Sequence, residues 1–152
     1  MAMQRATTGM VVAAAVAGIA VIALVAGLLS ASQPVPNSVN VKAAGVGVYW
    51  NKSCTNKTSS ISWGIVDPGG TKSFTVYVRN EGNVKEALSM VTGNWSNPSA
   101  SGYMKLTWNC SSYQLPQGAL VGALFTLNVF QNITGTGITS FGFYVTITGT
   151  EV

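Results

Sequence analysis

The feature that most constrains this chain is an uncharged, almost wholly apolar run, Met10–Leu29, near the start of its 152 residues. As a helix, a run of this length would cover about 30 Å, which is the thickness of a bilayer's hydrocarbon core. Pro34 and Pro36 would end such a helix, because proline lacks the backbone donor that a helix needs. The sequence therefore predicts a hydrophobic α-helix over residues 10–32, after a short leader or cytoplasmic tip at residues 1–9.

Three fates of this run stay open, and each implies a different mode of assembly. The run can be kept as a membrane anchor, kept as a helix in the core of a filament, or removed as a signal peptide. Arg5 precedes it and no charge follows until Lys42, which orients the C-terminus outward by the positive-inside rule. For removal, the sequence offers a signal-peptidase cut after Ala31 or Ser32. All three fates place the rest of the chain at the cell surface or outside the cell.

The run also carries a row of small residues at helical spacing. Small side chains let membrane helices approach closely, and this packing drives association where burial from water cannot. Alanine and glycine are common throughout the run, and cleaved signal segments are often alanine-rich. The row therefore fits a retained helix and a cleaved signal peptide alike. The candidate helix-packing residues are Gly9, Ala13, Ala17, Ala20 and Gly27.

Beyond residues 33–44, which indicate a linker or an extended arm, the hydrophobic period becomes two. Apolar Phe74 and Val78, for example, alternate with polar neighbours directly after the turn sequence Asp67-Pro68-Gly69-Gly70. Similar short segments recur with turn signals between them, and no helical period returns. The sequence predicts a mostly β fold for residues 45–152, namely an antiparallel immunoglobulin-like or fibronectin-like sandwich of about seven strands.

The polar composition argues against catalysis and against several kinds of partner. The chain has no histidine and only four carboxylates, so neither a Ser-His-Asp nor a Cys-His site can be built. Asp67 and Glu81 are explained by turns, although as a pair they would suit Ca²⁺, and Glu86 is expected on an exposed strand. The eight basic residues are scattered, whereas nucleic-acid binding needs a concentrated patch. We expect a protein that is not an enzyme, with no cofactor, metal, nucleic acid or small-molecule substrate.

The two cysteines, Cys54 and Cys110, are an even number in a chain with features of export. Such cysteines usually pair, and a bridge closing a loop of about 57 residues would stabilise the fold by about 4 kcal/mol. We therefore predict a disulfide between them.

Five Asn-x-Ser/Thr sites follow the apolar run, and if used they place the domain outside the cell and at its surface. The candidate glycosylation sites are Asn51, Asn56, Asn94, Asn109 and Asn132. Trp95 lies in a polar loop inside one of these sites, whereas the other three tryptophans fall on the apolar side of their segments. An exposed Trp95 would suit a sugar-binding module, which is a second class of function.

The segment Arg5-Ala6-Thr7-Thr8-Gly9, followed by a long apolar helix, resembles the leader of archaeal type IV pilins. The resemblance implies a prepilin-peptidase cut after Ala6, with Thr7 as the new N-terminus. It also implies that the helix lies in a hydrophobic filament core, with a glycosylated β-sandwich outside. The chain lacks the Glu near the mature N-terminus that bacterial pilins carry.

The domain sequence GVGVYW…CT…ISWGIVDPGGTKSFTVYVRNEGNVKEALSM resembles small β-sandwich surface proteins of archaea. In outline it is also similar to the bacterial biofilm-fibre family of TasA and to archaeal thread-like filaments. Those families lose a signal peptide and polymerise by inserting the mature N-terminal segment into a neighbouring sandwich. Carried over, the resemblance makes residues 33–44 the donor strand, with weak alternation at Val39, Val41 and Ala43.

Together these features favour a structural subunit of an extracellular filament that forms a homo-oligomer through its N-terminal helix and is inserted through the membrane. The alternatives are a single-pass anchored surface protein, a secreted donor-strand fibre subunit and a sugar-binding module.

Overall fold

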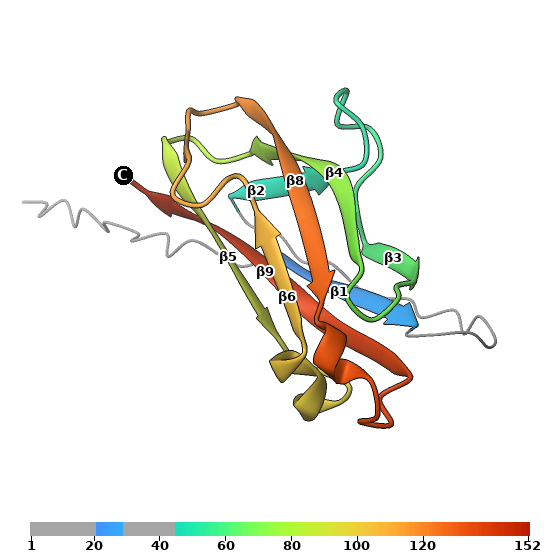
Figure 1. Ribbon diagram of the computed structural model, residues 1–152. Coiled ribbons are helices and arrows are strands. Elements are labelled where there is room, and N and C mark those ends of the chain that lie inside the picture. The colour runs from blue at the N-terminus through green and yellow to red at the C-terminus, as the bar shows by residue number, and fades with distance from the viewer. Residues whose placement is uncertain (1–20, 29–44) are drawn as a thin grey trace, which may run out of the picture.

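The computed structural model describes residues 21–28 and 45–152, which form two β-sheets (Figure 1). One sheet has the strand order β3-β1-β9-β5-β7 and the other has the order β2-β4-β8-β6. The strands are β1 (Val21–Leu28), β2 (Val46–Tyr49), β3 (Ser60–Ile65), β4 (Thr71–Asn80), β5 (Glu86–Gly93), β6 (Met104–Trp108), β7 (Gln114–Leu115), β8 (Leu120–Val129) and β9 (Ser140–Glu151). Two short 3₁₀ helices, η1 (Pro98–Gly102) and η2 (Gln131–Ile133), lie between strands.

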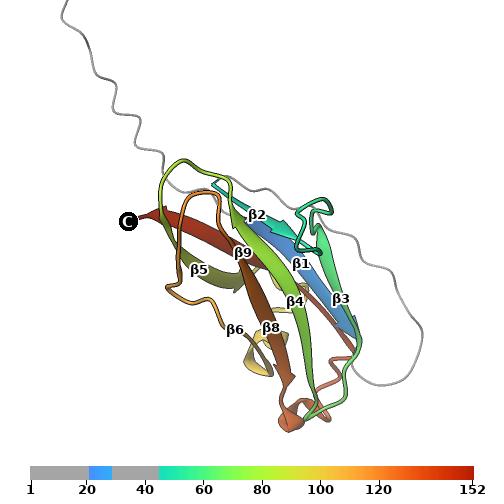
Figure 2. The ribbon, with the colours of Figure 1, turned by 90° about the horizontal axis from the view of Figure 1, so that it is seen from above.

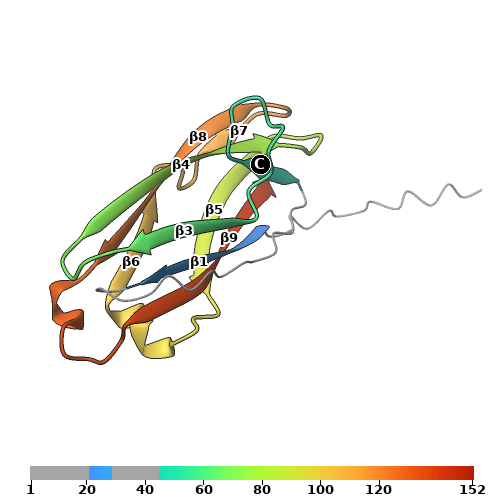
Figure 3. The same cartoon turned by 90° about the vertical axis from the view of Figure 1, so that its right-hand side faces the viewer.

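The two sheets form layers with a hydrophobic core between them (Figures 2 and 3). Each long strand sends alternate side chains inward, as the period of two requires. On β9 the buried row consists of Phe141, Phe143, Val145 and Ile147, and on β8 it consists of Ala123, Phe125, Leu127 and Val129. The mostly β fold predicted from the alternation is thus confirmed, although the described residues contain nine strands rather than about seven.

The predicted turn between β3 and β4 is present. The N–H of Gly70 donates to the carbonyl of Asp67 at 2.8 Å, and Gly69 has a φ of 78°, which glycine adopts without steric cost. The turn after β4 depends on the buried Asn80. Its amide donates to the Val84 and Leu115 carbonyls at 2.7 and 3.0 Å, which secures two loops at the same end of the sandwich.

The helix predicted over residues 10–32 is wrong for Val21–Leu28, because this segment is strand β1. An apolar run without polar residues fits a buried helix or a buried strand equally well by periodicity. The sequence VIALVAGL contains three β-branched residues, and the strand that it forms is paired on both sides. Residues 10–20 and 29–32 of the predicted helix lie outside the described residues.

Within residues 21–28 and 45–152, the structure has no helix long and apolar enough to cross a membrane.

The two ends of the sandwich are built from different turns. We call the end of the sandwich at which β2 begins, where Val46 pairs with Asn80, the β2 end. There the Gly45 carbonyl accepts a hydrogen bond from the N–H of Glu81 at 2.5 Å, and the N–H of Gly118 donates to the Asn80 carbonyl at 3.2 Å. The last residue of β9, Glu151, also lies here, because it pairs with Glu86, the first residue of β5. At the opposite end, the Pro68 end, lie the β3–β4 turn, η2 and the start of β9 (Figures 1 and 3).

Candidate strand-accepting site

Strand β1 lies between β3 and β9 and joins them into one sheet (Figure 1). It runs antiparallel to β9, from Val21 opposite Ile147 to Leu28 opposite Ser140. It runs parallel to β3, where the register extends from Leu24 opposite Ser60 to Leu28 opposite Ile65. Within the described residues no other strand pairs with β3, so β1 alone connects β3 to this sheet. We call the position between the facing edges of β3 and β9 the strand slot.

The inward row beside the strand slot is apolar along its whole length. The β9 residues Phe141, Phe143, Val145 and Ile147 are each at most 2% exposed, and they lie opposite Gly27, Val25, Ala23 and Val21 of β1. On the other side, Ile61 of β3 is 1% exposed and lies opposite Val25. Cross-strand neighbours on one face are the pairs that stabilise a sheet. The slot therefore suits a strand whose alternate residues are apolar.

A β-bulge on β3 determines the register within the strand slot. Ala26 lies opposite Ser62 but Gly27 lies opposite Gly64, so Trp63 is the extra residue. Gly64 has a φ of 61°, and the Trp63 carbonyl accepts a hydrogen bond from the Lys72 ammonium at 2.9 Å. Bulges of this kind re-aim the chain and oppose slippage of the register. A strand that enters the slot therefore has one favoured alignment.

The Trp63 ring is part of the core, as the sequence predicted for this residue. It is 1% exposed and packs edge-on against Phe74, with ring centroids 4.9 Å apart. Gly27, a candidate helix-packing residue, lies opposite Phe141 of β9 and opposite Gly64, the residue after the bulge on β3. In the structure this glycine lies in a strand rather than on a helix face.

Trp95, the candidate sugar platform, is half-buried. Its ring stacks on Phe143 at 4.2 Å between centroids with an interplanar angle of 22°, so one face of the indole is covered. The neighbouring Ser96 exchanges hydrogen bonds with Gly142 of β9 at 2.8 and 2.9 Å. The loop thereby covers the end of β9 from the side opposite the strand slot. Trp95 contributes to packing here, as the other tryptophans do.

The predicted disulfide between Cys54 and Cys110 is wrong for this structure, in which both cysteines are free. Cys54 lies in the loop after β2 and is half-buried, whereas Cys110 is 1% exposed and lies after β6. An even count in an exported chain favours pairing, but it carries no information about distance, and a disulfide requires Cα atoms within about 7 Å.

The two thiols should differ in reactivity. Burial raises the pKa of the Cys110 thiol, so little of the reactive thiolate forms, and the side chain is also shielded from reagents. We expect a thiol-specific chromogenic reagent to label Cys54 in the native protein and to label Cys110 only after unfolding. Counting thiols with and without denaturant measures this. If neither thiol is labelled in denaturant without a reductant, the cysteines are paired after all.

The five glycosylation candidates lie in different environments. Asn56, Asn94 and Asn132 are exposed. The side-chain oxygen of Asn109 accepts a hydrogen bond from the N–H of Leu124 at 2.8 Å, and that of Asn51 accepts from two backbone N–H groups of its own loop. Exposed asparagines without such contacts are the better acceptors for a glycan.

The carboxylates considered as a calcium pair lie at opposite ends of the sandwich. Asp67 is in the turn at the Pro68 end, whereas Glu81 lies at the β2 end. The Glu81 carboxylate accepts a hydrogen bond from the Tyr49 hydroxyl and lies 3.6 Å from the Lys57 ammonium. Burial, followed by this hydrogen bond, raises the pKa of Tyr49 to about 12. Asp67 and Glu81 therefore do not form a joint site.

Glu86, predicted on an exposed strand, is only 6% exposed. Its carboxyl packs against the backbone of Gly45, Gly82 and Gly149, and a Cβ at Gly45 would come within 2.6 Å of Oε1. Oε2 is buried and has no hydrogen-bond partner among the described residues. Desolvation disfavours the ionised form, so burial raises the pKa of Glu86 above its ordinary value. The group lies at the β2 end, where β2, β5 and β9 meet.

We expect Glu86→Gln to flatten the pH dependence of stability. A carboxyl with a raised pKa in the folded state leaves stability intact below its unfolded-state pKa, and stability falls as pH rises toward the folded-state pKa. For one group this slope is at most about 1.4 kcal/mol per pH unit. Urea unfolding between pH 4 and 8 measures it, with the exposed Glu151→Gln as a control. Equal slopes for the wild type and Glu86→Gln would contradict the prediction.

Several sequence candidates lie outside the described residues. These are the processing candidates Ala6, Ala31 and Ser32, the small residues Gly9, Ala13, Ala17 and Ala20, and the arm at residues 33–44. Sequence reasoning missed the strand slot, although the β-branched residues within the apolar run were a signal for it.

No protein-family model, curated protein or solved structure matches the chain.

Proposed function

We propose that this chain is a structural subunit of an extracellular surface filament whose sandwich accepts a β-strand in the strand slot. The observation that carries the proposal is the position of β1, paired on both sides and drawn from an apolar run. With the slot empty, β3 and β9 would each present a row of unpaired backbone groups, which are a template for another strand. Adding a strand to such an edge obtains affinity from backbone hydrogen bonds and specificity from alternate side chains.

Processing supplies the reason for a strand to come from another copy. A cut after Ala31 or Ser32 would remove β1 together with the leader and leave the strand slot empty. The arm at residues 33–44 of a neighbouring copy would then fill it, with Val39 and Val41 at alternate positions. Each subunit would both donate and accept a strand, and a head-to-tail contact of this kind extends into an open filament. The immunoglobulin-like or fibronectin-like relationship of the sandwich is part of this proposal.

The length of the uncharged run supports a second candidate, in which the run is kept. After a cut at Ala6, residues 7–32 would remain as a hydrophobic segment in a pilin-like filament core. Without any cut, the same segment would anchor one sandwich in the cytoplasmic membrane with its C-terminus outside. Both variants share the cell-surface location, the outward sandwich and the absence of a catalytic role.

The N-terminus of the protein recovered from the cell surface distinguishes these forms. We expect a mature chain beginning at Ser32 or Gln33, found in sheared filaments by negative-stain microscopy and intact-mass measurement. A chain beginning at Thr7 in filaments would replace strand donation by pilin-like packing. A full-length, monomeric protein in detergent would identify an anchor and would overturn the filament proposal.

A further inference from the structure

Building on the proposed function, we infer that a depression at the Pro68 end is the seat for the β2 end of a second copy. The inference names the face through which successive subunits would meet, beyond the strand that joins them. It rests on the position of the depression beside the strand slot and on the direction in which β1 runs.

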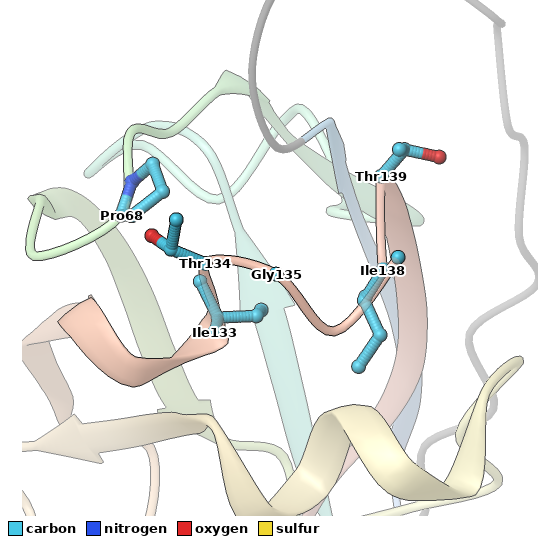
Figure 4. A pocket seen from close by; sticks show the side chains of 7 residues that line it. Pro68, Ile133, Thr134, Gly135, Ile138 and Thr139 are labelled. Atoms are coloured by element: carbon cyan, nitrogen blue, oxygen red, sulfur yellow. The ribbon is translucent and has the colours of Figure 1, made fainter.

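The depression has a volume of about 430 Å³ and lies beside the loop that leads into β9 (Figure 4). Its lining carries no charged residue and consists of Pro68, Ile133, Thr134, Gly135, Gly137, Ile138 and Thr139. The Thr136 hydroxyl donates to the Ile133 carbonyl at 2.7 Å and accepts from the N–H of Ile138 at 3.3 Å, so the loop is held by its own hydrogen bonds. The seat is therefore already shaped, and it suits an uncharged part of a protein surface.

The depression continues the strand slot. The last residue of β1, Leu28, lies opposite Ser140, and Thr139 next to it lines the depression. Because β1 runs toward the Pro68 end, any strand that takes its place in the same direction leaves the slot beside this depression (Figures 1 and 4). The part of the donor chain that comes directly after the donated strand must then lie over the depression.

That part of the donor chain is its β2 end. Strand β2 begins at Val46, and its partner there is Asn80, at the end of the sandwich opposite Pro68. Within one chain, Leu28 lies at the Pro68 end and Gly45 lies at the β2 end. Between two copies, the donated strand would leave the slot at the Pro68 end of the acceptor, directly beside the β2 end of the donor. Exchange of an element between copies is a low-cost route to assembly of this kind.

The β2 end offers an uncharged segment of matching chemistry. The turn between β7 and β8 contains exposed Pro116, Gln117 and Gly118, and the N–H of Gly118 donates to Asn80 at 3.2 Å. The exposed Asn83 lies in the neighbouring turn, between the charged residues Glu81 and Lys85. The turn with Pro116, Gln117 and Gly118 can enter an uncharged depression without burying an unpaired charge, whose desolvation would oppose binding.

Thr134→Arg in the full chain tests the seat, because Thr134 is exposed and a long cation there would fill the depression. We expect this variant to keep the wild-type melting temperature and N-terminal processing but to form at least tenfold fewer filaments. One control is Thr75→Arg, at an exposed position on β4 between the two ends. A second control is Asn132→Gln, because Thr134→Arg also removes the Asn132-Ile133-Thr134 glycosylation site and Asn132→Gln removes that site without adding a cation. Filaments of Thr134→Arg as abundant as those of the wild type would overturn the inference, and they would equally exclude a small ligand in the depression as a requirement for assembly.

Cross-linking then identifies the occupant directly. Copies carrying Thr139→Cys are mixed with copies carrying Asn83→Cys, both in a Cys54→Ser background, and are treated with a short thiol cross-linker. We expect linked dimers in filaments of the mixture and none in filaments of either variant alone. Dimers absent from the mixture would overturn the seat while leaving strand donation intact. A wild-type protein whose slot is never filled by another copy would overturn the proposed function as well.

Discussion

Replacing Phe143 by alanine should lower the free energy of unfolding by about 3 to 5 kcal/mol. Phe143 is fully buried in the first half of β9, stacks on Trp95 with ring centroids 4.2 Å apart, and lies 6.2 Å from the Phe141 ring centroid. Its loss removes apolar burial and leaves a cavity beside the Trp95 and Phe141 rings. Phe143 also lies opposite Val25 of β1, so its replacement removes a cross-strand neighbour from the strand slot. Urea unfolding followed by tryptophan fluorescence measures the change.

The matched control is Thr148→Ala on the same strand. Thr148 lies on the outward face of β9 and is half-buried, so its replacement should cost less than about 1 kcal/mol. If the two substitutions cost the same, the row that includes Phe143 is not the core of the sandwich, and the assignment of inward and outward faces fails.

Removing residues 1–44 should produce a weakened sandwich that a peptide in solution repairs. The truncated protein would have an empty strand slot, and a peptide carrying the β1 sequence VIALVAGL between flanking lysines should occupy it. A ligand at 100 times its Kd stabilises the folded state by about 2.7 kcal/mol. For a domain near this size, that raises the melting temperature by roughly 10 to 20 °C. Differential scanning fluorimetry with increasing peptide measures the shift.

Two further peptides make this test specific. A β1 peptide with proline at the position of Val25 lacks a backbone donor in the middle of the strand and should not raise the melting temperature. A peptide of residues 33–44 should raise it, because the proposal makes this arm the natural donor. A truncated protein as stable as the full chain and insensitive to every peptide would show that β1 is dispensable and that the slot does not accept strands.

The alternating part of the fold was accessible from the sequence. Phe74, Val76 and Val78 lie inward on β4 as their period of two indicates, and the Asp67–Gly70 turn is where proline and glycine placed it. Both signals are local, since a turn and a strand face are determined by residues a few positions apart. The buried row of β9 was predictable for the same reason.

The strand slot was not accessible in this way. Whether Val21–Leu28 forms a helix or a strand depends on whether two strand edges are available to it, and those edges belong to residues about 35 to 125 positions later in the chain. The burial of Glu86 and the separation of Cys54 from Cys110 are likewise set by long-range packing. Neither a residue type nor a spacing contains that information.

The sequence by itself determined the absence of histidine, the shortage of charge, the long apolar run and the alternation that makes the rest of the chain a β fold. Only the tertiary structure decided that part of the run is a strand, that it lies between β3 and β9, and that it points toward an uncharged depression at the Pro68 end. The physical reason is that a strand's hydrogen bonds are made with another strand. Its place therefore depends on which edges the folded domain leaves open.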